Sequence, residues 1–308
     1  MNISGQNNKP SIAILGVGGI GGFLAAILWK NGFPVTCIAR PDSVEQLNKT
    51  GIRLSSKIFG EISAHPRVVS ILEEDPDFLF IATKANDLPG ALQSVMADFL
   101  KKAVIIPLLN GVEHLEFLRS HFGNRVAAGM IGKTESKSES LGRIIHSSPS
   151  PPVIELSAER IDRKTIEKIA KILKDAGIEV NILNKDAEVI WRKLVRLNAI
   201  ACVTAATNQP LGYARNNPEW NKRLENCVSE GVLVAKAEGV FLDPELLMKE
   251  INSFPAELTT SLQRDINAGQ LSELDAIPGA ILRRAKRHGI QWPAIEDIFH
   301  TLLKLEKR

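Results

Sequence analysis

The feature that most constrains this chain is an apolar run that leads directly into a glycine-rich segment. Ile12-Ala13-Ile14-Leu15 is typical of a buried strand, and the G-x-G-x-x-G sequence Gly16-Val17-Gly18-Gly19-Ile20-Gly21 follows it, with a helical apolar pattern beyond. In this order the first glycine allows a tight turn, the second admits a pyrophosphate to the backbone, and the third lets helix and strand pack closely. The helix N-terminus adds unpaired N–H groups and partial positive charge. The segment therefore predicts a nucleotide site, with a purely structural turn as the alternative.

The rest of the first half alternates strand and helix patterns, which predicts a doubly wound parallel sheet of the Rossmann type. Buried strands are expected at 78–83 and 103–109, and a helix at 88–100. The apolar stretches Gly142–His146 and Val153–Leu156 are expected to extend this sheet as antiparallel strands, and 52–56 with 61–65 to form a separate antiparallel pair.

The character of the chain changes after about Asp186, where long segments of helical periodicity dominate. Helices are expected at 188–207, 218–238, 244–253, 280–288 and 294–306, with Pro and Gly between them. We therefore predict two domains, an α/β nucleotide-binding domain over 1–185 and an all-α substrate-binding and catalytic domain over 186–308.

Composition excludes several classes of protein. The net charge of +3 is too small to indicate nucleic-acid binding, and no apolar run approaches the roughly 20 residues of a membrane span. We expect no membrane partner, a cytoplasmic location, a disordered leader over the first ten residues and no metal site. The three cysteines are expected to be reduced and buried.

The residue after the second strand indicates which dinucleotide binds. An acid there pairs with the ribose 2′-hydroxyl of NAD, whereas a cation suits the 2′-phosphate of NADP. Here Arg40 follows the strand Pro34–Ala39, and Lys84 follows strand 78–83 at the same edge of the sheet. Two cations and no acid favour NADP(H), with a solvated arginine as the alternative. Asn110 follows a third strand, where it either contacts a ligand or forms an Asn-Gly turn.

With these features the chain resembles the ketopantoate reductases (2-dehydropantoate 2-reductases) over nearly its whole length. The resemblance rests on the order and spacing of five segments: Gly16–Gly21, Ala82-Thr83-Lys84-Ala85, Leu109-Asn110-Gly111, Ile190-Trp191-Arg192-Lys193-Leu194, and Ser272-Glu273-Leu274-Asp275 followed by Leu282-Arg283-Arg284-Ala285.

The resemblance implies a Rossmann domain, a C-terminal domain like that of 6-phosphogluconate dehydrogenase, and an NADPH site in the cleft between them. It implies that Lys193 is the catalytic lysine and that Glu273 is the essential glutamate, which also contacts the cofactor. Arg40 and Lys84 match cations near the adenosine phosphate. Further matches concern the nicotinamide and the substrate: Asn110 matches an asparagine near the nicotinamide and substrate, and Ser261 a serine that contacts the substrate.

The implied chemistry fits these residue types. Hydride transfer to a carbonyl carbon leaves negative charge on oxygen, which a lysine cation stabilises before it donates a proton. The apolar helical surroundings of Lys193 are expected to bury it in part and so to lower its pKa. Glu273 could hold Lys193 and bind a ribose or substrate hydroxyl. Taken alone, Lys193 would be interpreted as a solvated helix lysine and Glu273 as a helix-surface acid.

The sequence departs from the family in the substrate pocket. The family has asparagines four and eight residues after its lysine, where this chain has Leu197 and Ala201, and a third polar contact is replaced by Leu211. Asn198 lies at offset five, about 140° around the helix from Lys193. Either an irregularity turns Asn198 into the pocket as a substrate contact, or the pocket has lost polar groups.

These observations leave three hypotheses for the function. The first is an NADPH-dependent reductase of 2-oxo acids, with ketopantoate as the substrate and pantothenate biosynthesis as the pathway. The second is a paralogous reductase of a more apolar 2-oxo acid or a ketone. The third is an NADP(H)-binding sensor with little turnover, which would need neither Lys193 nor Glu273. A small-molecule 2-oxo acid is the expected partner, and a homodimer is left open.

Overall fold

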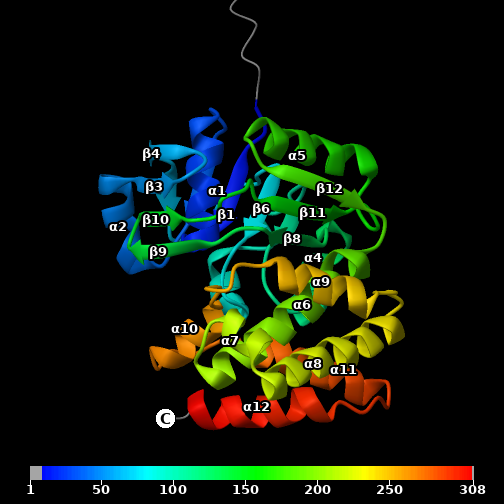
Figure 1. Ribbon diagram of the computed structural model, residues 1–308. Helices are drawn as coiled ribbons and strands as arrows, with labels where there is room; N and C mark the ends of the chain where they lie inside the picture. The colour runs from blue at the N-terminus through cyan, green and yellow to red at the C-terminus, as the bar shows by residue number, and fades with distance from the viewer. Residues whose placement is uncertain (1–8, 307–308) are drawn as a thin grey trace, which may run out of the picture. The chain divides into compact units, whose positions relative to one another are not determined.

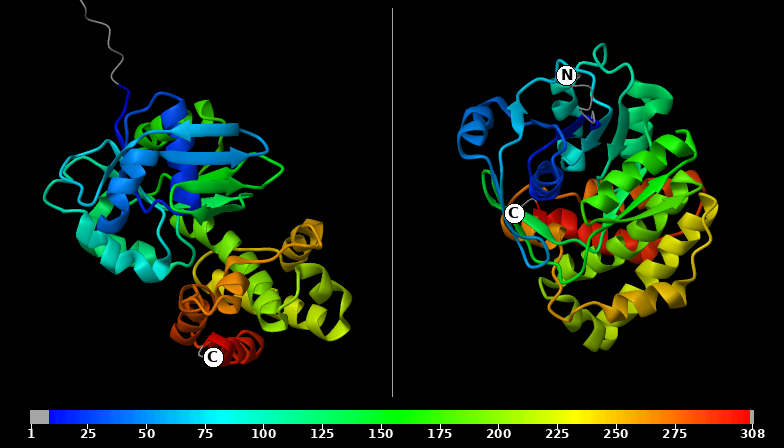
Figure 2. Two further views of the ribbon diagram at one scale, coloured as in Figure 1. Left: turned by 90° about the vertical axis from the view of Figure 1, so that its left-hand side faces the viewer. Right: turned by 90° about the horizontal axis from the view of Figure 1, so that it is seen from above.

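The computed structural model describes residues 9–306, and it divides into two compact units. The first unit contains the chain up to Leu109 together with His114–Asp186; the second contains Asn110–Glu113 and the chain from Ala187 onward. The first unit is an α/β Rossmann-type unit and the second is built of helices (Figures 1 and 2), which confirms the predicted fold class. Residues 1–8, where most of the predicted leader falls, lie outside the described residues.

The centre of the first unit is a five-stranded sheet in which every strand runs parallel to its neighbours. In spatial order its strands are β5 (Arg67–Val69), β2 (Val35–Ile38), β1 (Ile12–Leu15), β6 (Phe78–Ile81) and β7 (Val104–Pro107). Strands β1, β6 and β7 are buried at every position, as expected of strands covered on both faces. The register aligns Leu15 with Ile38 and Ile81, so the chain leaves β2, β1 and β6 at one edge, side by side.

Helix α1 (Gly19–Lys30) follows β1 and is buried on all sides from Gly21 to Leu28. A second sheet covers it, with the strand order β4 (Gly60–Ala64), β3 (Ile52–Ser56), β10 (Arg143–His146) and β9 (Ser136–Ser140). Ile144 of β10 occupies the space where a Cβ at Gly22 would stand. A helix that packs between two sheets must be apolar around its whole circumference, which is the composition of α1.

This second sheet partly corrects the predicted topology. The antiparallel pairing of β3 and β4 is confirmed. The prediction that Gly142–His146 extends the main sheet is wrong, because β10 pairs in parallel with β3. The reason is the burial of Ile144 and His146 against α1, where the His146 ring lies 4.8 Å from the ring of Phe23.

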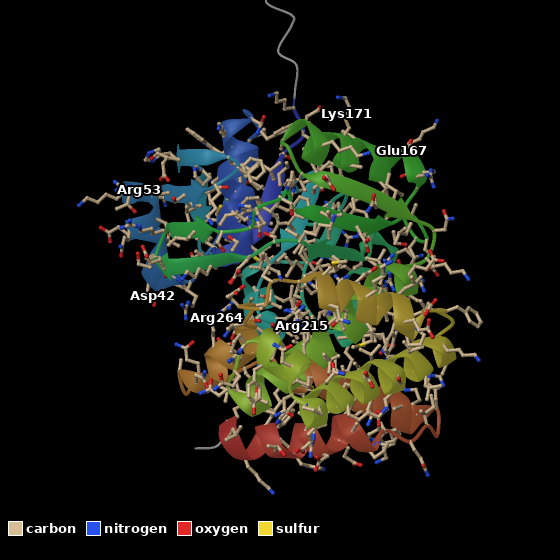
Figure 3. All side chains as sticks on the ribbon, viewed as in Figure 1. Asp42, Arg53, Glu167, Lys171, Arg215 and Arg264 are labelled. Carbon is tan, nitrogen blue, oxygen red and sulfur yellow. The ribbon has the colours of Figure 1, made fainter. Side chains whose placement is uncertain are left out.

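A third sheet and further helices complete the first unit. Strand β11 (Val153–Ser157) pairs antiparallel with β8 (Gly129–Gly132) and parallel with β12 (Glu179–Leu183). Between α1 and the second unit the chain also forms the α-helices α2 (Pro41–Thr50), α3 (Leu88–Ala91), α4 (Glu113–Phe122) and α5 (Arg163–Asp175). Glu167 and Lys171 project from the outer face of α5 (Figure 3), while its apolar face is buried.

The helix predicted over 88–100 is broken into short pieces. The turn η1 (Ala85–Asp87), α3 and the turn η2 (Leu92–Ser94) follow one another, and the chain is then extended at Val95. Val95 forms a parallel bridge with Leu72, whose N–H donates to the carbonyl of Ser94. This pairing with a distant segment ends the helix.

The second unit consists of helices and one π-helical turn. They are α6 (Asp186–Thr207), α7 (Leu211–Asn216), α8 (Pro218–Ala237), α9 (Pro244–Ser253), α10 (Ser261–Asn267), the π-helical turn η4 (Asp275–Gly279), α11 (Ala280–Arg287) and α12 (Pro293–Glu306). The five predicted helices correspond to α6, α8, α9, α11 and α12. Side chains cap several N-termini: Asn217 accepts from two N–H groups of α8, and Asp243 from two of α9.

The cysteines are free and buried, as predicted. Burial raises the pKa of Cys37 and of Cys202 to about 12, so these thiols stay protonated. Among the described residues, no helix is long and apolar enough to cross a membrane.

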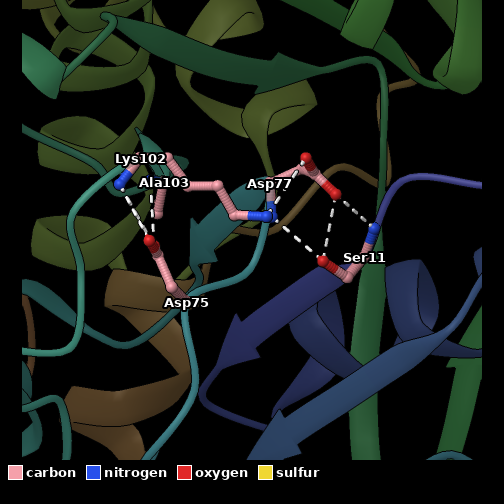
Figure 4. A network of polar contacts seen from close by, with 5 residues as sticks. All are labelled: Ser11, Asp75, Asp77, Lys102 and Ala103. Carbon is pink, nitrogen blue, oxygen red and sulfur yellow. Dashed lines mark hydrogen bonds and ion pairs between the residues drawn. The ribbon is translucent and has the colours of Figure 1, made fainter.

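A polar network connects the residues that precede the parallel strands β1, β6 and β7 (Figure 4). The Asp77 carboxylate, just before β6, accepts from the N–H and the hydroxyl of Ser11, just before β1, at 2.8 and 3.0 Å. Lys102, before β7, pairs with Asp77 at 3.6 Å, and the N–H groups of Lys102 and Ala103 donate to Asp75. Although burial alone would raise the pKa of Asp77, the hydrogen bonds from Ser11 and the nearby lysines lower it.

Asp77→Ala is expected to lower the free energy of unfolding by about 2 kcal/mol at pH 7, since hydrogen bonds to a charged acceptor are lost. Because the pKa of Asp77 is lowered in the folded state, its contribution is present above the unfolded pKa of about 3.9 and is lost as pH falls through the folded value. Urea denaturation at several pH values measures this. Asp98→Ala, at an exposed aspartate, is the control; an equal effect of both variants would contradict the role of the network.

Candidate functional site

The glycine loop between β1 and α1 has the shape of a phosphate cradle. Gly16 has φ +95°, which a residue with a side chain rarely adopts. A Cβ at Gly21 would overlap the carbonyl oxygen of Gly16, so this glycine brings helix and strand into direct contact. A Cβ at Gly18 would meet no atom within 4 Å, so the backbone there faces open space.

The groups around the loop fit an anionic ligand. Gly18 forms the N-cap of α1 without a side-chain hydrogen bond, and the first turn contains no acid. Within residues 9–306 no group forms a hydrogen bond with the buried hydroxyl oxygen of Thr83, which follows β6, and the methyl group of Thr83 lies beside Gly16. An uncapped helix N-terminus with an unpaired hydroxyl nearby suits a pyrophosphate. Ser136 of β9 closes one side of the loop, with its hydroxyl donating to the carbonyl of Gly19 at 2.8 Å.

The two predicted cations emerge on either side of this loop. Arg40 directly precedes α2 at the end of β2, and Lys84 lies three residues after β6. Because β1 lies between β2 and β6, the two strands are roughly 10 Å apart. The Arg40 side chain is exposed and, within residues 9–306, has no hydrogen bond or ion pair. It is therefore available to a ligand.

In the second unit, Asn110 and Glu273 come together. The side-chain Nδ2 of Asn110 donates to Oε2 of Glu273 at 2.8 Å, across a sequence separation of 163 residues. Residue Glu273 is only 6% exposed. Its neighbour Ser272 donates from its N–H, at 2.9 Å, and from its hydroxyl to the carboxylate of Glu306 near the end of α12. A buried carboxylate held in this way has a fixed direction.

Helix α6 places Lys193 half-buried, with Leu197 half-buried one turn later. Offsets of four share a helix face, so Ala201 lies next along it and is fully buried. The buried hydroxyl of Thr204 contacts that of Thr260 at 3.1 Å, and Thr260 caps α10. Ser261, the first residue of α10, is exposed beside this contact.

Asn198 has a different environment from Lys193. Helix α6 is α-helical from end to end, so the irregularity that would turn Asn198 toward the Lys193 face is absent. The Asn198 side chain is fully buried, and its Oδ1 lies 3.5 Å from Sγ of Cys202 one turn on. We therefore leave Asn198 out of the proposed site. Leu211 is likewise fully buried, at the start of α7.

Sequence reasoning missed several residues that shape the site. Thr83 and Arg283 lie in segments on which the family resemblance rests, but no function was predicted for either. No sequence pattern pointed to Ser136 or Glu306, because their hydrogen-bond partners are distant in sequence. The π-helical turn after Glu273 was also missed, and such turns are frequent at functional sites.

Comparison with known proteins places the chain in a family. The family model described as Ketopantoate reductase PanE/ApbA matches residues 12–158, and its C-terminal counterpart, Ketopantoate reductase PanE/ApbA C terminal, matches 187–306. The chain belongs to the ketopantoate reductase family. Members of this family are oxidoreductases that act on CH–OH groups, and this protein is an oxidoreductase of that type.

Individual relatives match over nearly the full length. The uncharacterized oxidoreductase YkpB of Bacillus subtilis (strain 168) is 30% identical, over 95% of this chain and 98% of its own. The solved structure of a PanE/ApbA family ketopantoate reductase from Ralstonia eutropha JMP134 matches with a TM-score of 0.85 at 26% identity, covering 96% and 98% of the two chains. The ternary structure of D-mandelate dehydrogenase with NADH and anilino(oxo)acetate shares the fold, with a TM-score of 0.87 at 22% identity and coverage of 96% and 98%.

Gly18→Ala separates the binding role of the glycine loop from its folding role. The added methyl meets no protein atom, so Tm is expected to change by less than about 2 °C. The same methyl stands where a pyrophosphate would approach, so the Kd for NADPH is expected to rise about tenfold or more. Calorimetric titration measures the Kd. Gly90→Ala, whose Cβ also meets nothing, is the control; unchanged NADPH binding by Gly18→Ala would exclude the loop as the phosphate site.

Proposed function

We propose that this ketopantoate reductase family member is an NADPH-dependent reductase that converts a 2-oxo acid into a 2-hydroxy acid. Its first candidate substrate is 2-dehydropantoate, which would place it in pantothenate biosynthesis. The observation that carries the proposal is the hydrogen bond between Asn110 and Glu273, because it holds a buried carboxylate in the same unit as Lys193. A protein that only binds nucleotide has no need of this arrangement.

The residues that we propose to bind the cofactor are Gly16–Gly21, Arg40 and Lys84 of the first unit, and Asn110 and Glu273 of the second. The loop and the uncapped N-terminus of α1 suit a pyrophosphate. The exposed guanidinium of Arg40 suits the 2′-phosphate of NADPH, since it can bind phosphate with two parallel hydrogen bonds. The structurally similar D-mandelate dehydrogenase is complexed with NADH, so the choice between the cofactors depends here on Arg40 and Lys84.

The proposed chemistry assigns one task to each polar group. When bound, the reduced nicotinamide supplies the hydride. The Lys193 ammonium stabilises the negative charge that develops on the carbonyl oxygen, and then donates a proton to it. The Glu273 carboxylate, held by Asn110, accepts a hydrogen bond from a substrate or ribose hydroxyl. Ser261 offers an exposed hydroxyl to the substrate.

A second candidate function is the reduction of a more apolar 2-oxo acid. Leu197 is half-exposed one turn beyond Lys193 on the same helix face, and the next position on that face is Ala201. Neither side chain can bind the 4-hydroxyl of 2-dehydropantoate. A site without such a donor or acceptor loses much of its preference for a substrate that carries the hydroxyl. The cytoplasmic location stays a prediction, and a homodimer stays open.

The proposed function is tested by the rate of NADPH oxidation with the purified protein. The panel contains 2-dehydropantoate, its analogue without the hydroxyl, 3,3-dimethyl-2-oxobutanoate, and aromatic 2-oxo acids, with NADH in place of NADPH as the cofactor control. Turnover with NADPH is expected, and Lys193→Ala is expected to reduce kcat by at least about 100-fold, as for loss of a general acid. Tight NADPH binding without turnover of any 2-oxo acid would reject the proposed reaction, and a preference for NADH would reject the role of Arg40 and Lys84.

Leu197→Asn distinguishes the two candidate substrates. If Leu197 lines the pocket, the added amide provides a partner for the 4-hydroxyl, and kcat/KM for 2-dehydropantoate relative to 3,3-dimethyl-2-oxobutanoate should rise about fivefold or more. Leu233→Asn, at an exposed leucine of α8, is the control. An unchanged ratio would show that Leu197 does not contact the substrate side chain.

A further inference from the structure

The short segment Asn110–Glu113 contacts Glu273 at one end and, further along, the two helical elements η4 and α11 that follow Glu273 in sequence. At one end, the Asn110 amide donates to the Glu273 carboxylate at 2.8 Å. In the middle, the backbone of Gly111 packs so tightly against Ala276 of η4 that a Cβ would overlap its carbonyl oxygen. At the other end, the Glu113 carboxylate accepts from Arg283 of α11. Residues 110–113 are therefore in contact with the π-helical turn and the residues on either side of it.

Arg283 forms the densest set of contacts in this region. Its Nε and Nη2 donate to the two oxygens of Glu113 at 2.8 and 2.7 Å, a bidentate arrangement. Its Nη1 and Nη2 donate to the carboxylate of Asp275 at 2.7 and 3.1 Å, and Nη2 also reaches the Asp275 carbonyl at 2.9 Å. One guanidinium thus joins the residue that begins η4 to the residue that begins α4.

We propose that Arg283 is a positioning residue, which holds the Asn110 amide and the Glu273 carboxylate in the geometry that the reaction needs. The inference rests on the proposed function of Glu273. Arg283 is placed to act through the protein rather than on the substrate, because its donors are directed at Glu113 and Asp275. Those two residues follow Asn110 and Glu273 in sequence by three and two positions, so fixing them fixes the hydrogen-bonded pair.

The chemistry of the side chain explains why an arginine stands here. Its planar guanidinium can bind two carboxylates in a fixed geometry, which a lysine ammonium cannot reproduce. Without the cation, Glu113 and Asp275 would be two neighbouring carboxylates that repel each other. The segment would then lose its anchor at Glu113, and Asn110 would leave Glu273 more often. A small displacement of a substrate-orienting group is enough to lower the rate by up to roughly 100-fold.

Steady-state kinetics of Arg283→Leu and Arg283→Lys test the proposal. With the preferred 2-oxo acid of the wild type, kcat is expected to fall about 10- to 100-fold for leucine and less for lysine. The KM for NADPH should rise by a smaller factor than kcat falls, because Asn110 and Glu273 are displaced while the glycine loop, Arg40 and Lys84 are untouched. In an Asn110→Ala background, Arg283→Leu should lower kcat by less than about twofold more, because both changes break one unit. Additive losses would overturn the proposal.

Hydrogen–deuterium exchange provides a readout that does not depend on turnover. The backbone amides of 110–113 are expected to exchange at least about tenfold faster in Arg283→Leu than in the wild type. The control is Arg223→Leu, which removes a comparably exposed arginine paired with Asp297 at 2.8 Å and Glu219 at 3.3 Å; it should leave these amides unchanged. Unchanged exchange in Arg283→Leu would overturn the positioning role. Absence of turnover by the wild type would reject the proposed function alone, and the exchange rates would then decide the role of Arg283.

Discussion

The hydrogen bond between Asn110 and Glu273 is the contact on which the candidate site depends. The carboxylate of a residue that is only 6% exposed is costly to bury unless polar groups surround it. Asn110 provides one such group, from the segment that follows β7. Hydrogen bonds on both sides of Glu273 hold its backbone in place. Ser272 donates to Glu306, and Arg283 donates to Asp275. The direction of the carboxylate is therefore set by three separate parts of the chain.

The parallel sheet provides the second constraint. Parallel strands in register release the chain at one edge, so Gly16, Arg40 and Lys84 follow three adjacent strands. This placement could be predicted from the sequence, because each strand is a short local apolar run and the G-x-G-x-x-G pattern sets where the first one ends. The shorter α7 and α10 of the second unit were not predicted, whereas helices α6, α8, α9, α11 and α12 were predictable for the same reason. Their periodicity is local, and Pro or Asn marks several starts.

Other features depend on pairing between distant segments, which one sequence does not reveal. Strand β10 joins β3 because Ile144 fits against Gly22 of α1, and the helix expected over 88–100 stops where Val95 meets Leu72. Glu273 accepts a hydrogen bond from Asn110, and its neighbour Ser272 donates to Glu306. Because both partners are distant in sequence, the burial of Glu273 could not be foreseen. The environment of Asn198 could not be predicted either, because a helical irregularity would place this residue on a different face of the helix than a regular α-helix does.

We propose that this ketopantoate reductase family member moves a hydride from NADPH to the carbonyl carbon of a 2-oxo acid. The most direct measurement uses NADPH that carries deuterium at the transferable position of the nicotinamide C4, with mass spectrometry and NMR of the 2-hydroxy acid formed. One deuterium bound to C2 of the product is expected for each cofactor oxidised. A product without deuterium at C2, or oxidation of the cofactor without formation of a 2-hydroxy acid, would contradict it.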